Sequence, residues 1–359
     1  MALPGWGYSS KIEITGATGA GPNYPVPLTV HSGSGTNSPG VIYLGGLCED
    51  FPNDLRFTGD DGVTELDPFN LDKHNPGADP THWLIEVKDN LDNNQSIYIY
   101  CGKAGAASPN NGENTFPFFS DFLGSSLDTD KWIEYESDGT YTIADSILTL
   151  DSGLVYNKYE AIGAKTQHGP SRAFGMRVKC NENKTCFLLV SASDRSDGGG
   201  VEGGGIDSAA FEHWHRARNS SSIFSSIKRE GVETWEGRDA GIENLFADYV
   251  YAEIRWTASA VKFAIEGVVC NTLESNVPAD DMGFDFWTRP GQTGGGDPLA
   301  AWIEVDWAFV RKYVDPEPVV GTPEDIEPCV VVPEVTHRHH PTHPTEPNRG
   351  KVLSRMGSL

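Results

Sequence analysis

The chain has 359 residues, a length that suits two domains and a tail better than one core. Its formal net charge of −24 disfavours binding to the phosphates of nucleic acids or to anionic membrane surfaces. No apolar run approaches the roughly 20 residues of a membrane helix, so we expect neither nucleic-acid binding nor membrane insertion. The N-terminus also lacks the charged and apolar segments of a signal peptide.

Forty Gly and 23 Pro, with many short β-branched runs, favour an all-β fold with many turns. Residues 1–103 are expected to form a first, small antiparallel β-sandwich. The segment Tyr8–Ile14 alternates with the period of a strand that has one buried face. Trp6, Phe57 and Trp83 fall between clusters of turn residues, and we expect them to help to fill or close the core of this sandwich.

The rest of the chain divides by composition. Residues 104–116 have the composition of a linker. Residues 117–314 are expected to form a second sandwich, with a large loop insertion at 194–245 where Gly and Ser runs cluster. Residues 315–359 form a Pro- and His-rich tail, which we expect to be extended and to become ordered only on a neighbouring subunit; a flexible, unbound extension is the alternative. The predicted fold class is therefore all-β: two antiparallel, jelly-roll-like β-sandwich domains and an extended Pro-rich tail.

The first half resembles a domain of unknown function common in archaeal, bacterial and viral surface proteins. The matching segments are Trp6–Ile14, Asp54–Phe57, Trp83 and Ile97–Gly102. This resemblance brings no catalytic residues with it.

The second half resembles concanavalin A-like lectin and glucanase domains. The opening strands match at Phe119–Phe122 and Leu127–Trp132, a middle hairpin at Tyr251–Gly267, and the last strand at Ile303–Tyr313. The resemblance implies a jelly roll. The last strand also alternates, which predicts one face with Ile303, Val305, Trp307 and Phe309, and the other with Glu304, Asp306 and Ala308.

The segment Glu304-Val-Asp306 resembles part of the Glu-x-Asp-x-x-Glu strand of glycosidases with this fold. Retaining hydrolysis needs two carboxyl groups about 5 Å apart. The second Glu is missing here, because Phe309 stands in its place. We therefore expect no catalytic residues and a protein that is not an enzyme.

Metal and ligand sites are predicted in three places. The resemblance implies a structural Ca²⁺ held by Asp306 and by oxygens near the first strand, where Asp121 lies. In the insertion, His213, Trp214, His215 and Trp235 are the candidate ligand-binding residues, since loop-borne aromatic residues often provide such a surface. In the tail, His337 and His339 are candidate metal ligands if three chains meet there, and a polar tail without metal is the alternative.

Six cysteines lack the C-x-x-C spacing of structural zinc sites. Cys180 and Cys186 flank a polar turn, so both a disulfide across a hairpin and reduced, packed thiols stay open.

The function expected from these features is that of a non-enzymatic virion structural or surface protein, such as a tail fibre, head fibre, turret or decoration subunit. Its partners would be copies of itself, other virion proteins and a glycan or other receptor on the host surface. The alternative is an extracellular or cell-surface carbohydrate-binding protein or adhesin. A glycoside hydrolase is the third class considered.

Overall fold

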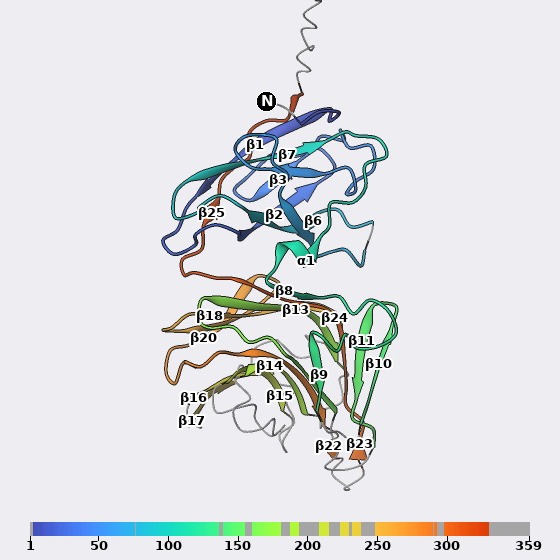
Figure 1. Ribbon diagram of the computed structural model, residues 1–359, viewed down its shortest axis with the longest axis vertical. Coiled ribbons are helices and arrows are strands. Elements are labelled where there is room, and N and C mark those ends of the chain that lie inside the picture. The colour runs from blue at the N-terminus through green and yellow to red at the C-terminus, as the bar shows by residue number, and fades with distance from the viewer. Residues whose placement is uncertain are drawn as a thin grey trace, which may run out of the picture. The chain divides into compact units, whose positions relative to one another are not determined.

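Two pairs of β-sheets account for most of the secondary structure (Figure 1). The computed structural model describes residues 3–329, with gaps at 76, 136–138, 155–159, 181–186, 194–207, 215–222, 230–231, 238–247, 290 and 293–297. Nearly all of its regular structure is strand, as predicted.

The first sandwich has two sheets that enclose one apolar core. One sheet contains β1 (Tyr8–Thr15), β7 (Gln95–Cys101) and β4 (Arg56–Thr58), and the other β3 (Val41–Tyr43), β2 (Tyr24–His31), β6 (Thr81–Val87) and β5 (Asp67–Asn70). Phe57 and Trp83 are buried in this core with their rings 5.7 Å apart, as predicted. Trp6 is also buried, but it packs in a separate cluster with Leu3 and Tyr100.

The chain returns to this first sandwich after the second one is complete. Two short strands, β25 (Val319–Val320) and β26 (Glu327–Pro328), pair with β1. Between them, the Ser10 hydroxyl donates to the Glu324 carbonyl over 2.7 Å. The prediction that all of residues 315–359 would order only on a neighbouring subunit is therefore wrong for 315–329. A Pro-rich segment can still cover an exposed strand edge, because only some of its amides need to pair.

The second sandwich packs an eight-stranded sheet against a seven-stranded one, which confirms the predicted antiparallel fold. The first of these sheets contains β10 (Thr140–Ala144), β11 (Ile147–Asp151), β24 (Trp302–Lys312), β13 (Arg172–Cys180), β18 (Val250–Trp256), β19 (Val261–Ile265) and β20 (Val268–Leu273), with β8 (Phe118–Ser120) beside β24. The second contains β17 (Val232–Gly237), β16 (Ile223–Arg229), β15 (Ser208–Trp214), β14 (Phe187–Ser193), β21 (Gly283–Arg289), β12 (Glu160–Ala164) and β9 (Trp132–Glu134). A further pair is β22 (Gly291–Gln292) with β23 (Pro298–Leu299).

The predicted loop insertion at 194–245 is wrong in its described part. Strands β15, β16 and β17 extend the seven-stranded sheet as an antiparallel meander. The segment Ile223-Phe-Ser-Ser-Ile227 shows no regular alternation in its own residues, and it forms a strand because it pairs with neighbouring strands.

A β-bulge in β24 changes which side chains reach the core. Arg177 pairs with Trp307 whereas Val178 pairs with Val305, so Asp306 is an extra residue on β24. Because strand side chains alternate, this insertion turns Trp307 and Phe309 to the outer face of the sheet, where they belong to a different apolar cluster from Val305. The prediction of an unbroken alternation from 303 to 309 is therefore wrong beyond Val305.

An aromatic cluster joins the two sandwiches, and we call it the junction cluster. It contains Phe69, Leu84, Phe116, Phe119, Trp307 and Phe309. The rings of Phe116 and Phe309 stack with their centroids 4.1 Å apart, and Phe69 meets Trp307 edge-on at 5.5 Å.

Part of the predicted linker packs into this junction. The short helix α1 (Gly112–Thr115) is capped by Asn111, whose side chain accepts from Asn114 N at 3.2 Å. The Asn111 amide also donates to Pro68 O of β5 over 2.8 Å. Residues through Cys329 accordingly form one compact unit, and the predicted division into domains at 103 and 117 stays a prediction.

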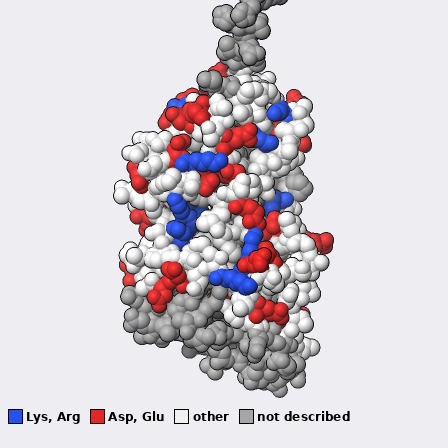
Figure 2. Space-filling view, viewed as in Figure 1, with Lys and Arg blue, Asp and Glu red and all other residues white. Residues whose placement is uncertain are grey.

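Acidic side chains are spread over the visible surface, with Lys and Arg between them (Figure 2). No helix in the described part of the chain has the length and apolar composition to cross a membrane.

Candidate functional site

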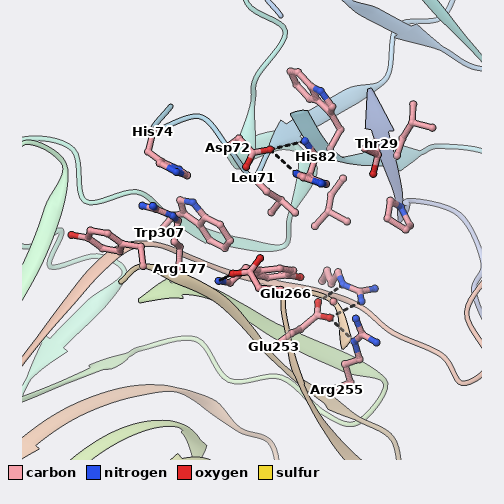
Figure 3. Close-up of a pocket in the computed structure, with 18 of the residues that line it drawn as sticks. Thr29, Leu71, Asp72, His74, His82, Arg177, Glu253, Arg255, Glu266 and Trp307 are labelled. Atoms are coloured by element: carbon pink, nitrogen blue, oxygen red, sulfur yellow. Dashed lines mark hydrogen bonds and ion pairs between the residues drawn. The ribbon is translucent and has the colours of Figure 1, made fainter. Parts of the chain in front are cut away.

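A cavity of about 460 Å³ lies between the two sandwiches, beside the junction cluster (Figure 3). We call it the junction cavity. Its volume falls in the usual range of ligand pockets, roughly 300–1,000 Å³. The first sandwich supplies residues of β2, of β6 and of the turn before β6, and the second supplies residues of β13, β18 and β24. The lining includes Asp72, His74, His82, Arg177, Tyr249, Tyr251, Glu253, Arg255, Glu266, Trp307, Arg311 and Glu317.

Small residues on β13 allow long charged side chains to meet across it. Ala173 pairs with both Arg255 and Arg311, one on each neighbouring strand. With only a methyl group between them, the two guanidinium groups both reach the carboxylate of Glu253. Gly175 leaves space for the ring of Phe309, since a Cβ at Gly175 would come within 2.4 Å of that ring.

Glu253 is the centre of a buried ion-pair network. Its carboxylate accepts from Arg311 Nε at 2.6 Å and Nη2 at 3.1 Å, and from Arg255 Nε at 2.5 Å. Burial alone would raise the pKa of Glu253, but the charges of Arg311 and Arg255 lower it to about 2. Glu253 therefore stays ionised at neutral pH, and it holds both guanidinium groups against the cavity wall (Figure 3).

The same network ties the returning segment to both sandwiches. Arg311 donates to Glu317, with Nη1 at 2.6 Å from Oε2. The Tyr24 hydroxyl of β2 donates to the same oxygen over 2.8 Å. One carboxylate thus links β24, β2 and the segment that leads to β25.

A second charged group lies at the other end of the cavity. Arg177 Nη1 donates to Asp306 Oδ2 over 2.9 Å, and its guanidinium lies 4.2 Å from the ring centroid of Tyr249. His74 Nδ1 lies 3.8 Å from the same Asp306 oxygen. Burial, with the charge of Arg177, lowers the pKa of His74. His74 is therefore a neutral imidazole at neutral pH.

The wall from the first sandwich carries a hydrogen-bonded pair, Asp72 and His82. Asp72 Oδ2 lies 2.9 Å from His82 Nδ1 and accepts from the His82 backbone amide at 2.6 Å. The hydrogen bond to Asp72 raises the pKa of His82. Burial would raise the pKa of Asp72, but its bonds to His82 lower it.

The floor is aromatic and contains one unused donor. Trp307 is fully buried, and its Nε1 has no hydrogen-bond partner among the described residues. Glu266 lies in the two-residue turn between β19 and β20, where it and Gly267 both have positive φ values, 48° and 77°. Its Oε1 accepts from the Tyr251 amide at 2.8 Å, which places the carboxylate at the rim of the cavity.

The cavity therefore combines ring faces with ionised acceptors and guanidinium donors. This set suits a ligand that carries hydroxyl groups on an otherwise apolar framework, since hydroxyls pair with carboxylates and guanidinium groups while C–H faces lie against rings.

The predicted ligand-binding residues lie elsewhere. His213 and Trp214 belong to β15 and Trp235 to β17, in the seven-stranded sheet, whereas the cavity is built on the eight-stranded one. His215, His337 and His339 lie outside the described residues, as does Cys186.

The two predicted calcium ligands each have a side-chain cation as partner. Asp306 pairs with Arg177, and Asp121 pairs with Lys73 Nζ at 3.0 Å. A Ca²⁺ ion there would have to displace both cations, so these residues as placed do not fit the ion. Across the described ranges, no group of three or more His, Cys, Asp or Glu is arranged to hold a metal.

Sequence reasoning missed the residues of the junction cavity, although a signal was present. In β18, Tyr251, Glu253 and Arg255 share one face of the strand, opposite to Ala252 and Ile254. A bulky aromatic residue on the charged face of a strand indicates that another part of the protein covers this face and shields it from solvent.

The comparisons with known proteins concern both halves of the chain. Residues 51–135 match a domain of unknown function, DUF2341. The matched range confirms the predicted resemblance, and it runs from the first sandwich through α1 into the opening strands of the second. No curated protein matches the chain.

Several solved structures are similar to the chain over about half its length. One is an endo-β-1,3-glucanase from Pyrococcus furiosus, with 13% identity, 55% of this chain and 94% of that one covered, and a TM-score of 0.44. Another is a β-glucanase from Bacillus licheniformis, with 14% identity, coverages of 54% and 97%, and a TM-score of 0.43. A third is a prokaryotic β-1,3-1,4-glucanase (lichenase) derived from a mouse hindgut metagenome, with 13% identity, coverages of 55% and 99%, and a TM-score of 0.44.

These comparisons contradict the prediction that the protein is not an enzyme, because the similar solved structures are named as β-glucanases. We therefore withdraw that prediction. The chain resembles concanavalin A-like β-glucanases in the fold of its jelly-roll second half, and a segment that matches DUF2341 leads into that half.

Proposed function

We propose that this protein binds a carbohydrate in the junction cavity. The observation that carries the proposal is the lining: the partly exposed rings of Tyr249 and Tyr251 lie beside the charged side chains of Glu266, Asp72 and Arg177. A sugar offers C–H faces to these rings and hydroxyl groups to the charged atoms.

The rim position of Glu266 makes it the best single probe of binding. Its side chain is exposed, so a substitution there leaves the buried network intact. Glu266→Gln removes the charge and keeps an oxygen that can accept from the Tyr251 amide. A hydrogen bond to a charged group contributes about 1.5–3 kcal/mol, so affinity is expected to fall by roughly 10- to 100-fold.

The test begins with the full chain on an array of plant, microbial and animal glycans, followed by calorimetry with each glycan that binds. Glu274→Gln is the matched control, because Glu274 is an exposed carboxylate directly after the same hairpin. Equal affinity in the Glu266 and Glu274 variants would refute binding at the rim. Bound glycan is recovered and its reducing ends are counted, which separates binding from cleavage.

We further propose that the protein is displayed on a virion surface, with an extracellular or cell surface as the alternative, and that it assembles with copies of itself. The resemblance of the first half to a domain common in surface proteins, stated from the sequence, supports this location. Labelling of particles and of intact producing cells with an antibody to the full chain tests it. A signal confined to the cell interior would refute it.

A further inference from the structure

Two cysteines of the first sandwich lie against each other. Cys48 follows the turn after β3, and Cys101 is the last residue of β7. Both are thiols in this structure, Cys101 fully buried and Cys48 partly exposed. The neighbouring Cys101 thiol, together with burial, raises the pKa of the Cys48 thiol.

One buried carboxylate holds the two cysteine-bearing segments together. Asp54 Oδ2 accepts from the Glu49 amide at 2.5 Å and from the Gly102 amide at 3.2 Å. Glu49 follows Cys48 and Gly102 follows Cys101, so the carboxylate fixes the residue next to each thiol.

A glycine permits the close approach of the two backbones. Gly102 has a positive φ of 76°, and a Cβ there would come within 3.0 Å of Leu47 O. The carbonyl just before Cys48 therefore lies against the residue just after Cys101. Leu47 and Cys48 both pack on the apolar core that contains Cys101.

We infer that Cys48 and Cys101 form a structural disulfide when the protein meets an oxidant of the disulfide class. The bond would join the segment between β3 and β4 to β7 across the end of the sandwich. Such cross-links persist in oxidising surroundings such as the outside of cells and virions.

The reaction balances with glutathione disulfide as the oxidant. The Cys48 thiolate, which is the partly exposed one, attacks a glutathione sulfur, breaks its S–S bond and releases one glutathione. The Cys101 thiolate then attacks the Cys48 sulfur of the mixed disulfide and releases the second glutathione. Two protein thiols are oxidised, two glutathione thiols form, and the thiol protons pass to the released glutathiones.

Cys329 is nearby but is excluded as the partner of Cys101. Strand β1 lies between them, since Tyr8 pairs with Cys101 on one side and with Pro328 on the other. Two strand spacings are about 9–10 Å, beyond the roughly 7 Å limit between the Cα atoms of a disulfide. Cys329→Ser is therefore a matched control for loss of a thiol in the same region.

The test treats the full chain with oxidised glutathione in mildly alkaline buffer, followed by peptide mapping and thermal unfolding. The wild type and Cys329→Ser are expected to yield one linked peptide pair containing Cys48 and Cys101. The mass of this pair should be two hydrogens below the summed mass of the two free peptides. Their Tm should rise by about 5 °C or more on oxidation. Cys101→Ser should keep one glutathione on Cys48, because the resolving thiol is gone.

Cys48→Ser provides a second readout if Cys101→Ser does not fold. In that variant Cys101 should stay a thiol, since it is buried from the reagent. The inference is overturned if the wild type keeps glutathione on Cys48, if the linked pair contains another cysteine, or if both residues remain thiols.

Discussion

Glu253 is expected to be the most costly charge to remove from the junction. The variant Glu253→Gln leaves the guanidinium of Arg311, which is 4% exposed, with Glu317 as its remaining acidic partner. Breaking a buried ion pair by removing one partner typically costs about 3–5 kcal/mol. We expect the free energy of unfolding to fall by that amount, because three hydrogen bonds to the carboxylate are weakened or lost.

The assay is urea unfolding at neutral pH, with Glu274→Gln as the exposed control, expected to change stability by less than about 0.5 kcal/mol. The double variant Glu253→Leu with Arg311→Met should lose less than Glu253→Gln, because neither buried charge is then left without its partner. A loss below about 1 kcal/mol for Glu253→Gln would refute the reasoning.

The pH dependence of this effect follows from the lowered pKa of Glu253. A carboxyl group whose folded pKa is depressed contributes stability above its unfolded pKa. That stability is lost as the pH falls from the ordinary value of 4.5 towards about 2. The difference between wild type and Glu253→Gln should therefore be constant above about pH 5 and shrink below it.

Three further predictions concern the neighbouring elements. Gly175→Ala should cost about 1–3 kcal/mol in urea unfolding, because its methyl group would meet the ring of Phe309, and an unchanged stability would contradict that packing. Deletion of residues 330–359 should leave the Tm unchanged. Deletion of residues 315–359 should lower the Tm by several degrees, because the edge of β1 loses its paired strands β25 and β26. Equal Tm values for the two deletions would show that these strands add no stability. An NMR titration should find the pKa of His82 above 6.5 and closer to that value in Asp72→Asn, and an unshifted His82 would exclude the Asp72 hydrogen bond.

Local alternation was enough to predict several of the strands and the all-β class, whereas the jelly roll of the second half was implied by the resemblance and strands β15–β17 were missed. Segments such as β1 and β18 carry their burial pattern in their own residues, because every second side chain must enter a core. The aromatic cores of both sandwiches could be predicted for the same reason.

Features set by pairing between distant segments could not be predicted in this way. The bulge at Asp306 depends on the register between β24 and β13, which the residues of β24 alone do not fix. Strand β25 is only two residues long, too short for any pattern, and it exists because β1 offers an open edge. The junction cavity draws Asp72 and Glu253 from opposite halves of the chain, so it appears only when the two sandwiches meet.

A crystal structure of the full chain with a glycan selected on the array tests the central claim most directly. We predict that the sugar lies in the junction cavity, with a ring face near Tyr251 and a hydroxyl within hydrogen-bonding distance of the Glu266 carboxylate. A sugar bound instead on the seven-stranded sheet, beside His213 and Trp214 of β15, would contradict the proposal and restore the site first predicted from the sequence.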